Sequence, residues 1–290
     1  MEFPVSVALA QSVSDLPQGP GWWFEPKFDG HRTLLWRQND SVRMQARSGR
    51  DVTSVWADLA RAGVVLPTGT VIDGEAVVFI DGVVDFAAAQ SRAASSPARA
   101  ARLAEQYPAS FAAWDILSHG EFGDVRSRPY SERRALLLDV LGGVGPPLQA
   151  VPATDDREVA MVWYDSLRAQ GLEGVVAKRA SSSYRSGRSG SGWLKVRHAE
   201  TVDAEVVGYT GSPRRPRALA VRLPDGRTAL SRAVPAPVAA AVGDRLLGVG
   251  TGSRSRTGAG EPYTAVDTGL VAEVLAGTTR HATVTVTRLR

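Results

Sequence analysis

The order of apolar and polar residues along the first 200 positions predicts strands and helices in mixed sequence. Residues 31–47 read as a hairpin, because two strand-like runs flank the turn pair Asn39-Asp40. Apolar residues recur at helical spacing in residues 52–63, before Gly63. The same patterns predict strands at 71–79, 111–117 and 172–179, and helices at 87–106 with a break at Pro97, 131–142 and 155–171.

The pattern changes near Thr201, where helical spacing fades and short apolar runs take its place. The runs EVVGYTG, ALAVRL, LLGVG and TVTVT read as strands, and Pro224-Asp225-Gly226 reads as a turn. Short strands at this spacing are typical of a small barrel or sandwich. We therefore expect two domains, residues 1–200 and 201–290.

Composition and charge exclude several classes of protein. The 290 residues contain no cysteine, so a thiolate nucleophile and a Cys-based zinc site are excluded. The four histidines are scattered without metal-ligand spacing. No apolar run is long enough to span a membrane and no signal peptide is evident, so we expect a cytoplasmic protein. A net charge of +4 and a pI of about 9.7 favour polyanionic partners such as nucleic acid.

Lysine is rare in this chain. The 34 basic residues comprise 31 arginines and only three lysines, Lys27, Lys178 and Lys195. Arginine stays protonated at any accessible pH, whereas a desolvated lysine can lose its proton and become a nucleophile. We therefore interpret the lysines as positions that need a compact or deprotonatable amine. The alternative is that they are ordinary surface charges.

The surroundings of the lysines favour the chemical interpretation. Acidic residues accompany two of them, Asp29 beside the first and Glu173 shortly before the second. Lys195 and Arg197 are two positions apart, so on a strand both project from one face. Two cations on one face repel each other unless they share an anion, and a triphosphate would serve.

Six segments in order resemble the motifs of the covalent nucleotidyltransferases. They are KFDG at 27–30 followed by Arg32, ARSGRDVT at 46–53, DGE at 73–75, FAAWDIL at 111–117, EGVVAK at 173–178 and WLKVR at 193–197. KxDG alone is a weak signal, but six ordered matches are a strong one. The chain resembles the ATP-dependent DNA ligases, and EPKFDGHR is most similar to the bacterial ligases of end joining and repair.

This resemblance implies a fold and a reaction. The fold is α+β: an ATP-grasp-like nucleotidyltransferase domain of antiparallel sheets with helices, followed by a small OB-fold β-barrel. Lys27 would attack the α-phosphate of ATP and form a lysyl–AMP, which requires a neutral amine. The AMP would then pass to a DNA 5′-phosphate, and the neighbouring 3′-hydroxyl would displace it. The implied setting is a nucleoid-associated monomer that acts on nicked or broken DNA, with separate Ku-like or polymerase/primase partners.

The resemblance also assigns residues. The implied catalytic residues are Lys27, Lys195 and Arg197. Lys27 is also an implied nucleotide contact, through its bond to AMP. Glu25 is implied on the adenine side, Trp114 stacked on adenine, and Arg32 and Glu75 near the ribose. The implied phosphate contacts are Arg47, Lys178, Lys195 and Arg197. The implied ligands of Mg²⁺ (or Mn²⁺) are Glu75 and Glu173. Each has a plainer alternative, such as strand core for Trp114 or solvated charge for Arg32 and Arg47.

The resemblance weakens toward the C-terminus. GLVAEV at 269–274 is similar to a late ligase strand, but the expected Leu-Arg-x-Asp-Lys motif is represented only by Arg288-Leu289-Arg290. We therefore expect that Arg288 or Arg290 acts alone or that self-adenylation is slow. Two other functions stay open: an RNA ligase or GTP-using capping-type transferase, and a non-catalytic nucleic-acid-binding relative.

Overall fold

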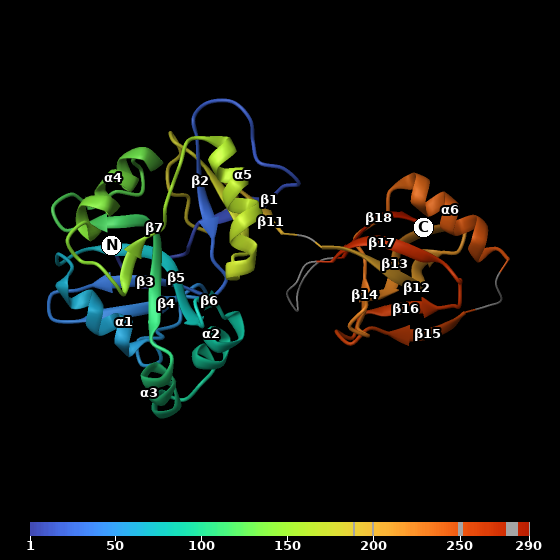
Figure 1. Cartoon of the computed structure of the whole chain (residues 1–290), viewed down its shortest axis with the longest axis horizontal. Coiled ribbons are helices and arrows are strands. Elements are labelled where there is room, and N and C mark those ends of the chain that lie inside the picture. Colours follow the sequence, from blue (N-terminus) through green and yellow to red (C-terminus); the bar gives the residue numbers. More distant parts are fainter. Residues whose placement is uncertain (188, 199, 249–251, 277–283, 290) are drawn as a thin grey trace. The chain divides into compact units, whose positions relative to one another are not determined.

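The chain forms two compact units, residues 1–197 and 198–290, in a computed structural model (Figure 1). The structure describes all residues except 188, 199, 249–251, 277–283 and 290. Each unit has its own hydrophobic core and is described by itself.

The smaller sheet of the first unit brings distant parts of the chain together in the order β1–β11–β10–β2. β1 runs parallel to β11, and the other pairs are antiparallel. Helix α5 (Arg157–Ser166) packs on β2 and β10, and the apolar side chains between them form a core cluster. The four strands are β1 (Leu9–Ser12), β2 (Trp22–Lys27), β10 (Gly174–Arg179) and β11 (Ser189–Arg197).

The larger sheet of the first unit has the order β4–β3–β5–β7–β8, with β6 on β5 and β9 on β7. All pairs are antiparallel except β7 with β9. Its strands are β3 (His31–Arg37), β4 (Val42–Ala46), β5 (Val71–Ile80), β6 (Val83–Val84), β7 (Ala109–His119), β8 (Gly123–Asp124) and β9 (Leu148–Ala150).

Helices cover the larger sheet and bury its main core. α4 packs on β7 and β9, and α1 packs on β4 and β7. Asp85 and Ser96 cap α2 and α3, because their side chains accept backbone N–H groups of the first turn. The helices are α1 (Ala57–Ala62), α2 (Phe86–Ala93), α3 (Pro97–Gln106) and α4 (Tyr130–Leu141), with short 3₁₀ turns η1 (Gly63–Val65) and η2 (Leu167–Gln170).

The second unit is a strongly bent sheet with one described helix, α6 (Ala236–Leu246), packed on β13. The long strand β12 pairs with β13, β16 and β17, and β18 adds to β17. A parallel bridge between Ser231 and Val284 joins the ends of the sheet beside β14 and β18. The strands are β12 (Glu200–Ser212), β13 (Arg215–Arg222), β14 (Thr228–Leu230), β15 (Ser253–Arg256), β16 (Pro262–Ala265), β17 (Val271–Ala276) and β18 (Thr285–Leu289).

Most of the predicted elements are confirmed, and the structure differs from the prediction at three points. The predicted strand at residues 246–250 is wrong where it is described, because Leu246 ends α6 and residues 247–248 form a turn. Helix α6 was missed, although Ala239, Val242, Gly243 and Leu246 are buried at helical spacing. The predicted helix at 52–63 begins five residues later, after a turn.

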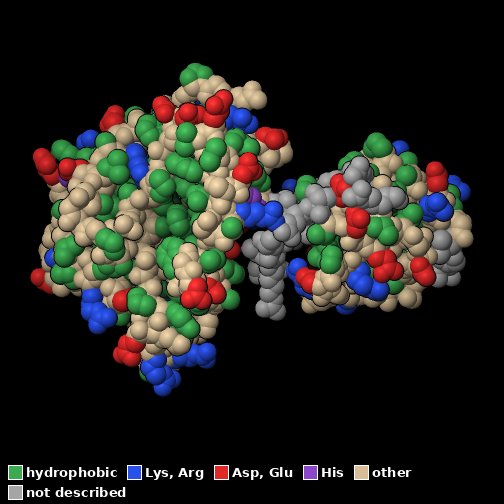
Figure 2. All heavy atoms as spheres, viewed as in Figure 1, with side chains coloured by type: hydrophobic (Ala, Val, Ile, Leu, Met, Phe, Trp, Pro, Cys, Tyr) green, Lys and Arg blue, Asp and Glu red, His purple; other side chains and the backbone are tan. Residues whose placement is uncertain are grey.

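Charged side chains of both signs are scattered over the visible face of each unit (Figure 2). On this face, neither unit shows a large surface patch made only of basic or only of acidic side chains. Within the described part of the chain, every helix is too short or too polar to cross a lipid bilayer.

Candidate active site

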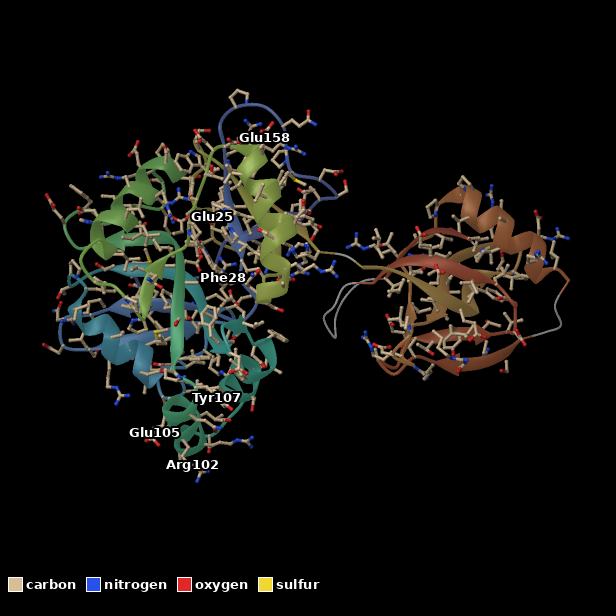
Figure 3. The ribbon with its side chains drawn as sticks, viewed as in Figure 1. Glu25, Phe28, Arg102, Glu105, Tyr107 and Glu158 are labelled. Carbon is tan, nitrogen blue, oxygen red and sulfur yellow. The ribbon has the colours of Figure 1, made fainter. Side chains whose placement is uncertain are left out.

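Strands of both sheets in the first unit contribute residues to one cavity of about 460 Å³. Figure 3 labels Glu25 and Phe28, which line this cavity, whereas Arg102 and Glu105 lie at the outer end of α3. All ten site residues expected from the sequence line it: Glu25, Lys27, Arg32, Arg47, Glu75, Trp114, Glu173, Lys178, Lys195 and Arg197. The fold therefore gathers residues that lie up to 172 positions apart in the sequence.

A close approach of three strands positions the first lysine. Gly174 pairs with Lys27 on one side and with Arg197 on the other, and the Glu173 N–H donates to the Lys27 carbonyl at 2.8 Å. Gly174 has φ of +150°, and a Cβ there would lie 2.0 Å from the carbonyl oxygen of Val196. Only glycine fits this approach, so the strand register itself sets Lys27 beside Glu173 and Arg197.

The outer cluster is defined here as Lys27, Arg47, Glu173, Lys195 and Arg197. Glu173 forms ion pairs with both Lys27 and Arg197 through its two carboxylate oxygens. The side chains of Lys27 and Arg197 are 20% and 46% exposed, whereas Glu173 is 7% exposed. Burial, together with the neighbouring cations Arg197 and Lys27, lowers the pKa of Lys195 to about 8. The cluster carries four cations and one carboxylate, so it favours an anionic ligand.

Two further carboxyl groups in the cavity, those of Glu75 and Asp29, have raised pKa values because their surroundings disfavour the ionised form. Burial raises the pKa of Glu75 to about 8, and burial with the nearby charge of Glu173 raises the pKa of Asp29 to about 6. Within the described residues, no three His, Cys, Asp or Glu side chains cluster as a preformed metal site. Mg²⁺ binds through one or two carboxylates plus substrate phosphates, so Glu75 and Glu173 fit this mode of binding.

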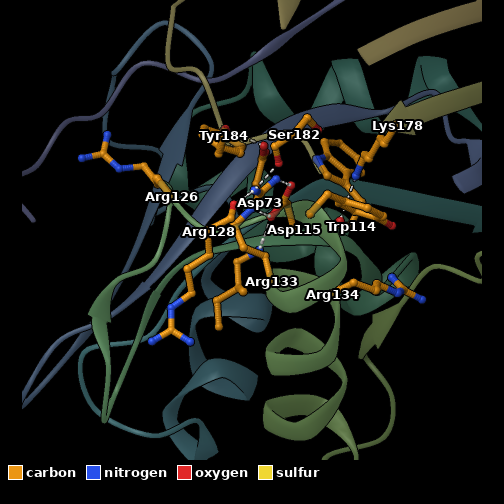
Figure 4. Close-up of polar contacts among 12 residues, drawn as sticks. Asp73, Trp114, Asp115, Arg126, Arg128, Arg133, Arg134, Lys178, Ser182 and Tyr184 are labelled. Carbon is orange, nitrogen blue, oxygen red and sulfur yellow. Dashed lines mark hydrogen bonds and ion pairs between the residues drawn. The ribbon is translucent and has the colours of Figure 1, made fainter. Parts of the chain in front are cut away.

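A buried polar network fixes Arg32 at the wall of the cavity, and Figure 4 labels its partners Asp73 and Trp114 together with Tyr184. Its guanidinium donates to both oxygens of Asp73, at 3.0 and 2.6 Å, and lies 5.3 Å from the ring centroid of Trp114. The Tyr184 hydroxyl donates to the same carboxylate at 2.7 Å. Asp73 is fully buried, so it holds Arg32 in one orientation.

The inner cluster is defined here as Glu25, Tyr130, Lys178 and Trp193. Lys178 pairs with Glu25 at 2.8 Å and donates to the Trp114 carbonyl at 2.9 Å, and the Tyr130 hydroxyl donates to Glu25. The side chains of Lys178 and Glu25 are 1% and 3% exposed. Lys178 is thus engaged with Glu25, apart from the ion pairs of the outer cluster.

Sequence reasoning missed the residues that support the site. Tyr130 begins α4, Tyr184 lies in a polar loop, and Trp193 was read only as part of a motif. A lone aromatic residue in a Ser- and Gly-rich stretch is the available signal for Tyr184. Of the expected C-terminal residues, Arg290 lies outside the described residues and the side chain of Arg288 is not described.

Comparison with known proteins gives one family. The family of the ATP dependent DNA ligase domain matches residues 7–197. Two similar proteins are DNA ligase C2 of Mycolicibacterium smegmatis, 40% identical over 207 residues, and DNA ligase C of Mycobacterium tuberculosis, 37% identical over 211 residues. Each alignment covers 71% of this chain and 57% or 58% of the relative, so the chain spans less than two thirds of their length.

Solved structures share the fold over nearly the whole chain. The ligase domain of M. tuberculosis LigD is 23% identical, with a TM-score of 0.55 and coverage of 98% of this chain and 95% of that one. A Lig E DNA ligase described as binding DNA with a minimal scaffold is 16% identical, with a TM-score of 0.58 and coverage of 98% and 99%. At these identities the likeness concerns the arrangement of helices and sheets.

Proposed function

The chain belongs to the ATP-dependent DNA ligase family, and from this premise we propose that it seals 5′-phosphate/3′-hydroxyl breaks in DNA. The observation that carries the proposal is the place of Lys27: it lines the cavity, partly exposed, in contact with Glu173 and among cations. A lysine in that position can serve as the nucleophile of a nucleotidyl transfer.

The first step in the proposal charges the enzyme. The neutral amine of Lys27 attacks the α-phosphate of ATP, and pyrophosphate leaves, so that a P–N bond joins AMP to the enzyme. Lys195, Arg197 and Arg47 neutralise phosphate charge at the mouth of the cavity. Glu173, in direct contact with the Lys27 ammonium, is the nearest group to take its proton.

The later steps transfer AMP to DNA. A DNA 5′-phosphate oxygen attacks the phosphorus of the lysyl–AMP, and Lys27 leaves. The 3′-hydroxyl of the adjoining strand then displaces AMP from the adenylated end and closes the break. Positioning and charge neutralisation supply most of the catalysis in such transfers.

The cavity walls divide the contacts to the nucleotide. We assign Glu25 and the ring of Trp114 to the adenine and Arg32 with Glu75 to the ribose. The enclosure of Lys178 by Glu25 and the Trp114 carbonyl favours a base-facing position for this lysine over the phosphate contact implied by the resemblance.

Mg²⁺ or Mn²⁺ would be held by Glu75 and Glu173 together with substrate phosphates. Burial destabilises the Glu75 carboxylate and raises its pKa to about 8, so a metal cation would have to displace a proton there, and its positive charge would then stabilise the buried anion. When bound, the metal would polarise phosphate oxygens.

We assign an OB-fold to the second unit, which would contact the DNA. Five of its strands, β12, β13, β14, β17 and β18, are linked in a ring by ladder pairs and the Ser231–Val284 bridge, which supports a small barrel. Nicked or broken DNA is the proposed partner, and separate end-joining or repair proteins would recruit the enzyme to it.

A labelling experiment tests the proposal. Purified protein is incubated with Mg²⁺ and ATP or GTP labelled at the α-phosphate, and denaturing gels report the covalent label. Label from ATP that disappears in Lys27→Ala, followed by sealing of a nicked DNA duplex, is expected. Label from GTP would favour a capping-type transferase, sealing of RNA alone would favour an RNA ligase, and no label in protein first treated with pyrophosphate would favour a binding role.

A further inference from the structure

Two aromatic rings enclose the ammonium group of Lys178. Its Nζ atom lies 4.3 Å from the ring centroid of Trp193 and 4.8 Å from that of Tyr130. The remaining contacts are the Glu25 carboxylate at 2.8 Å and the Trp114 carbonyl at 2.9 Å. These groups replace nearly all the water around a charged side chain, because Lys178 is 1% exposed.

The charge state of this lysine depends on opposing effects. Burial lowers the pKa of Lys178, and this effect outweighs the negative charges of Glu25, Asp115 and Asp73, which raise it. Arg134 is on the same helix as Tyr130. A nitrogen of its guanidinium lies 4.0 Å from a carboxylate oxygen of Glu25, so Arg134 competes with Lys178 for that carboxylate. The faces of aromatic rings attract cations most strongly when water is excluded, so the two rings favour the charged form.

The two rings come from different elements and one of them has a second role. Trp193 lies on β11 beside Lys178 in the strand register, and Tyr130 is the first residue of α4. Burial, and then the charge of Glu25, raises the pKa of Tyr130 well above its ordinary value, so its hydroxyl stays a donor to Glu25. Tyr130 therefore fixes both members of the Lys178–Glu25 pair.

We propose that Tyr130 and Trp193 are positioning residues that keep Lys178 as an ammonium ion at the cavity wall, where it holds the Glu25 carboxylate in a fixed orientation toward the nucleotide. The part that concerns the nucleotide rests on the proposed function. The part that concerns the ammonium does not, since the enclosure exists in the protein alone.

The rarity of lysine allows a direct measurement. With only three lysines in the chain, protein labelled with ¹³C at lysine Cε gives three side-chain signals, which Lys27→Arg and Lys195→Arg assign. We expect the titration midpoint of Lys178 to fall by about one pH unit, a tenfold change in proton affinity, in Trp193→Leu and in Tyr130→Leu. Trp193→Phe keeps an aromatic face and should stay close to the wild-type midpoint.

A matched control comes from the same sheet. Trp22 is also buried and has Arg179 over its ring at 4.4 Å, but it does not line the cavity. Trp22→Leu therefore removes a buried indole without touching the enclosure, and the Lys178 midpoint should not move. An unchanged Lys178 midpoint in both Leu variants at the enclosure overturns the proposal.

The functional part uses the pH dependence of ATP labelling. In the Leu variants, KM for ATP should rise about tenfold on the alkaline side, while kcat at saturating ATP changes less. A merely structural role would lower labelling equally at all pH values, which also overturns the proposal. Should the Leu variants fail to fold, a Lys178 midpoint in Trp193→Phe that departs from the wild-type value overturns the proposal. If wild-type protein takes no label, the proposed function fails while the titration still decides the enclosure.

Discussion

The inner and outer clusters use the same kinds of charge in opposite ways. In the inner cluster, Lys178 and Glu25 are almost completely buried, and each contacts several fixed partners. In the outer cluster, Lys27 and Arg197 are partly exposed and share the single carboxylate of Glu173. Removing one member of a buried ion pair strongly destabilises the fold, because the remaining charge has neither water nor a partner to stabilise it. In the outer cluster, one carboxylate cannot neutralise the several cations around it, so these cations can still bind an anionic substrate.

The largest effect is expected at the outer cluster. Lys27→Arg keeps a cation beside Glu173 but removes the amine to which we assign the nucleophilic attack, and arginine cannot replace it. We expect ATP labelling to fall at least about a thousandfold at every pH. The thermal unfolding temperature should change by less than about 2 °C, since the side chain is partly exposed. Labelled Lys27→Arg protein would place the covalent bond on another residue.

The second prediction concerns the inner cluster. Lys178→Met fills a similar volume but leaves Glu25 buried without its closest ion-pair partner, which should destabilise the first unit by about 3–5 kcal/mol. Its unfolding midpoint in a thermal melt should fall by roughly 10 °C. Adding Glu25→Gln removes the unpaired charge and should recover part of the loss. A single variant as stable as wild type would contradict the comparison.

The third prediction concerns Glu75, a carboxyl of the cavity that belongs to neither cluster, and the effect of its ionisation on the free energy of unfolding. Burial raises the pKa of this carboxyl from 4.5 to about 8, so the folded chain holds a proton there that the unfolded chain releases. The free energy of unfolding therefore decreases as the pH rises through this range. Glu75→Gln should match wild type near pH 4 and exceed it by at least about 1 kcal/mol near pH 8, measured by urea unfolding without divalent ions.

A solvated carboxylate supplies the control for that titration. Glu205 is exposed on β12, and Glu205→Gln should run parallel to wild type across the same pH range. Parallel curves for Glu75→Gln and wild type would show that Glu75 ionises as a solvated carboxyl does.

The smallest effect is expected at a surface pair of the second unit. A guanidinium nitrogen of Arg222 lies 3.0 Å from a carboxylate oxygen of Glu205, but the two side chains are 54% and 49% exposed. Arg222→Ala should cost less than about 1 kcal/mol, and the cost should vanish near about 0.5 M salt. Urea unfolding at two salt concentrations measures it. A larger, salt-independent loss would mean that exposure does not separate structural pairs from solvated ones in this chain.

Local patterns in the sequence predicted the motif residues and most strands, because strand periodicity and turn residues act over short distances. The residues that orient the site escaped prediction for the opposite reason. The Tyr130–Glu25 and Tyr184–Asp73 hydrogen bonds join residues 105 and 111 positions apart, and no spacing rule connects them. Helix α6 escaped because its valines and Gly243 are weak helix formers that interrupt the alanines, and packing on β13 outweighs this local preference.

The close approach at Gly174 has a consequence for protein engineering. Main-chain pairing of β2, β10 and β11 sets the spacing of the backbone positions from which the side chains of Lys27, Glu173 and Arg197 project. A three-stranded cassette that includes this glycine would therefore carry its reactive geometry into a foreign scaffold. A graft that replaces the glycine with alanine would separate the strands and lose that spacing, however faithfully the side chains were copied.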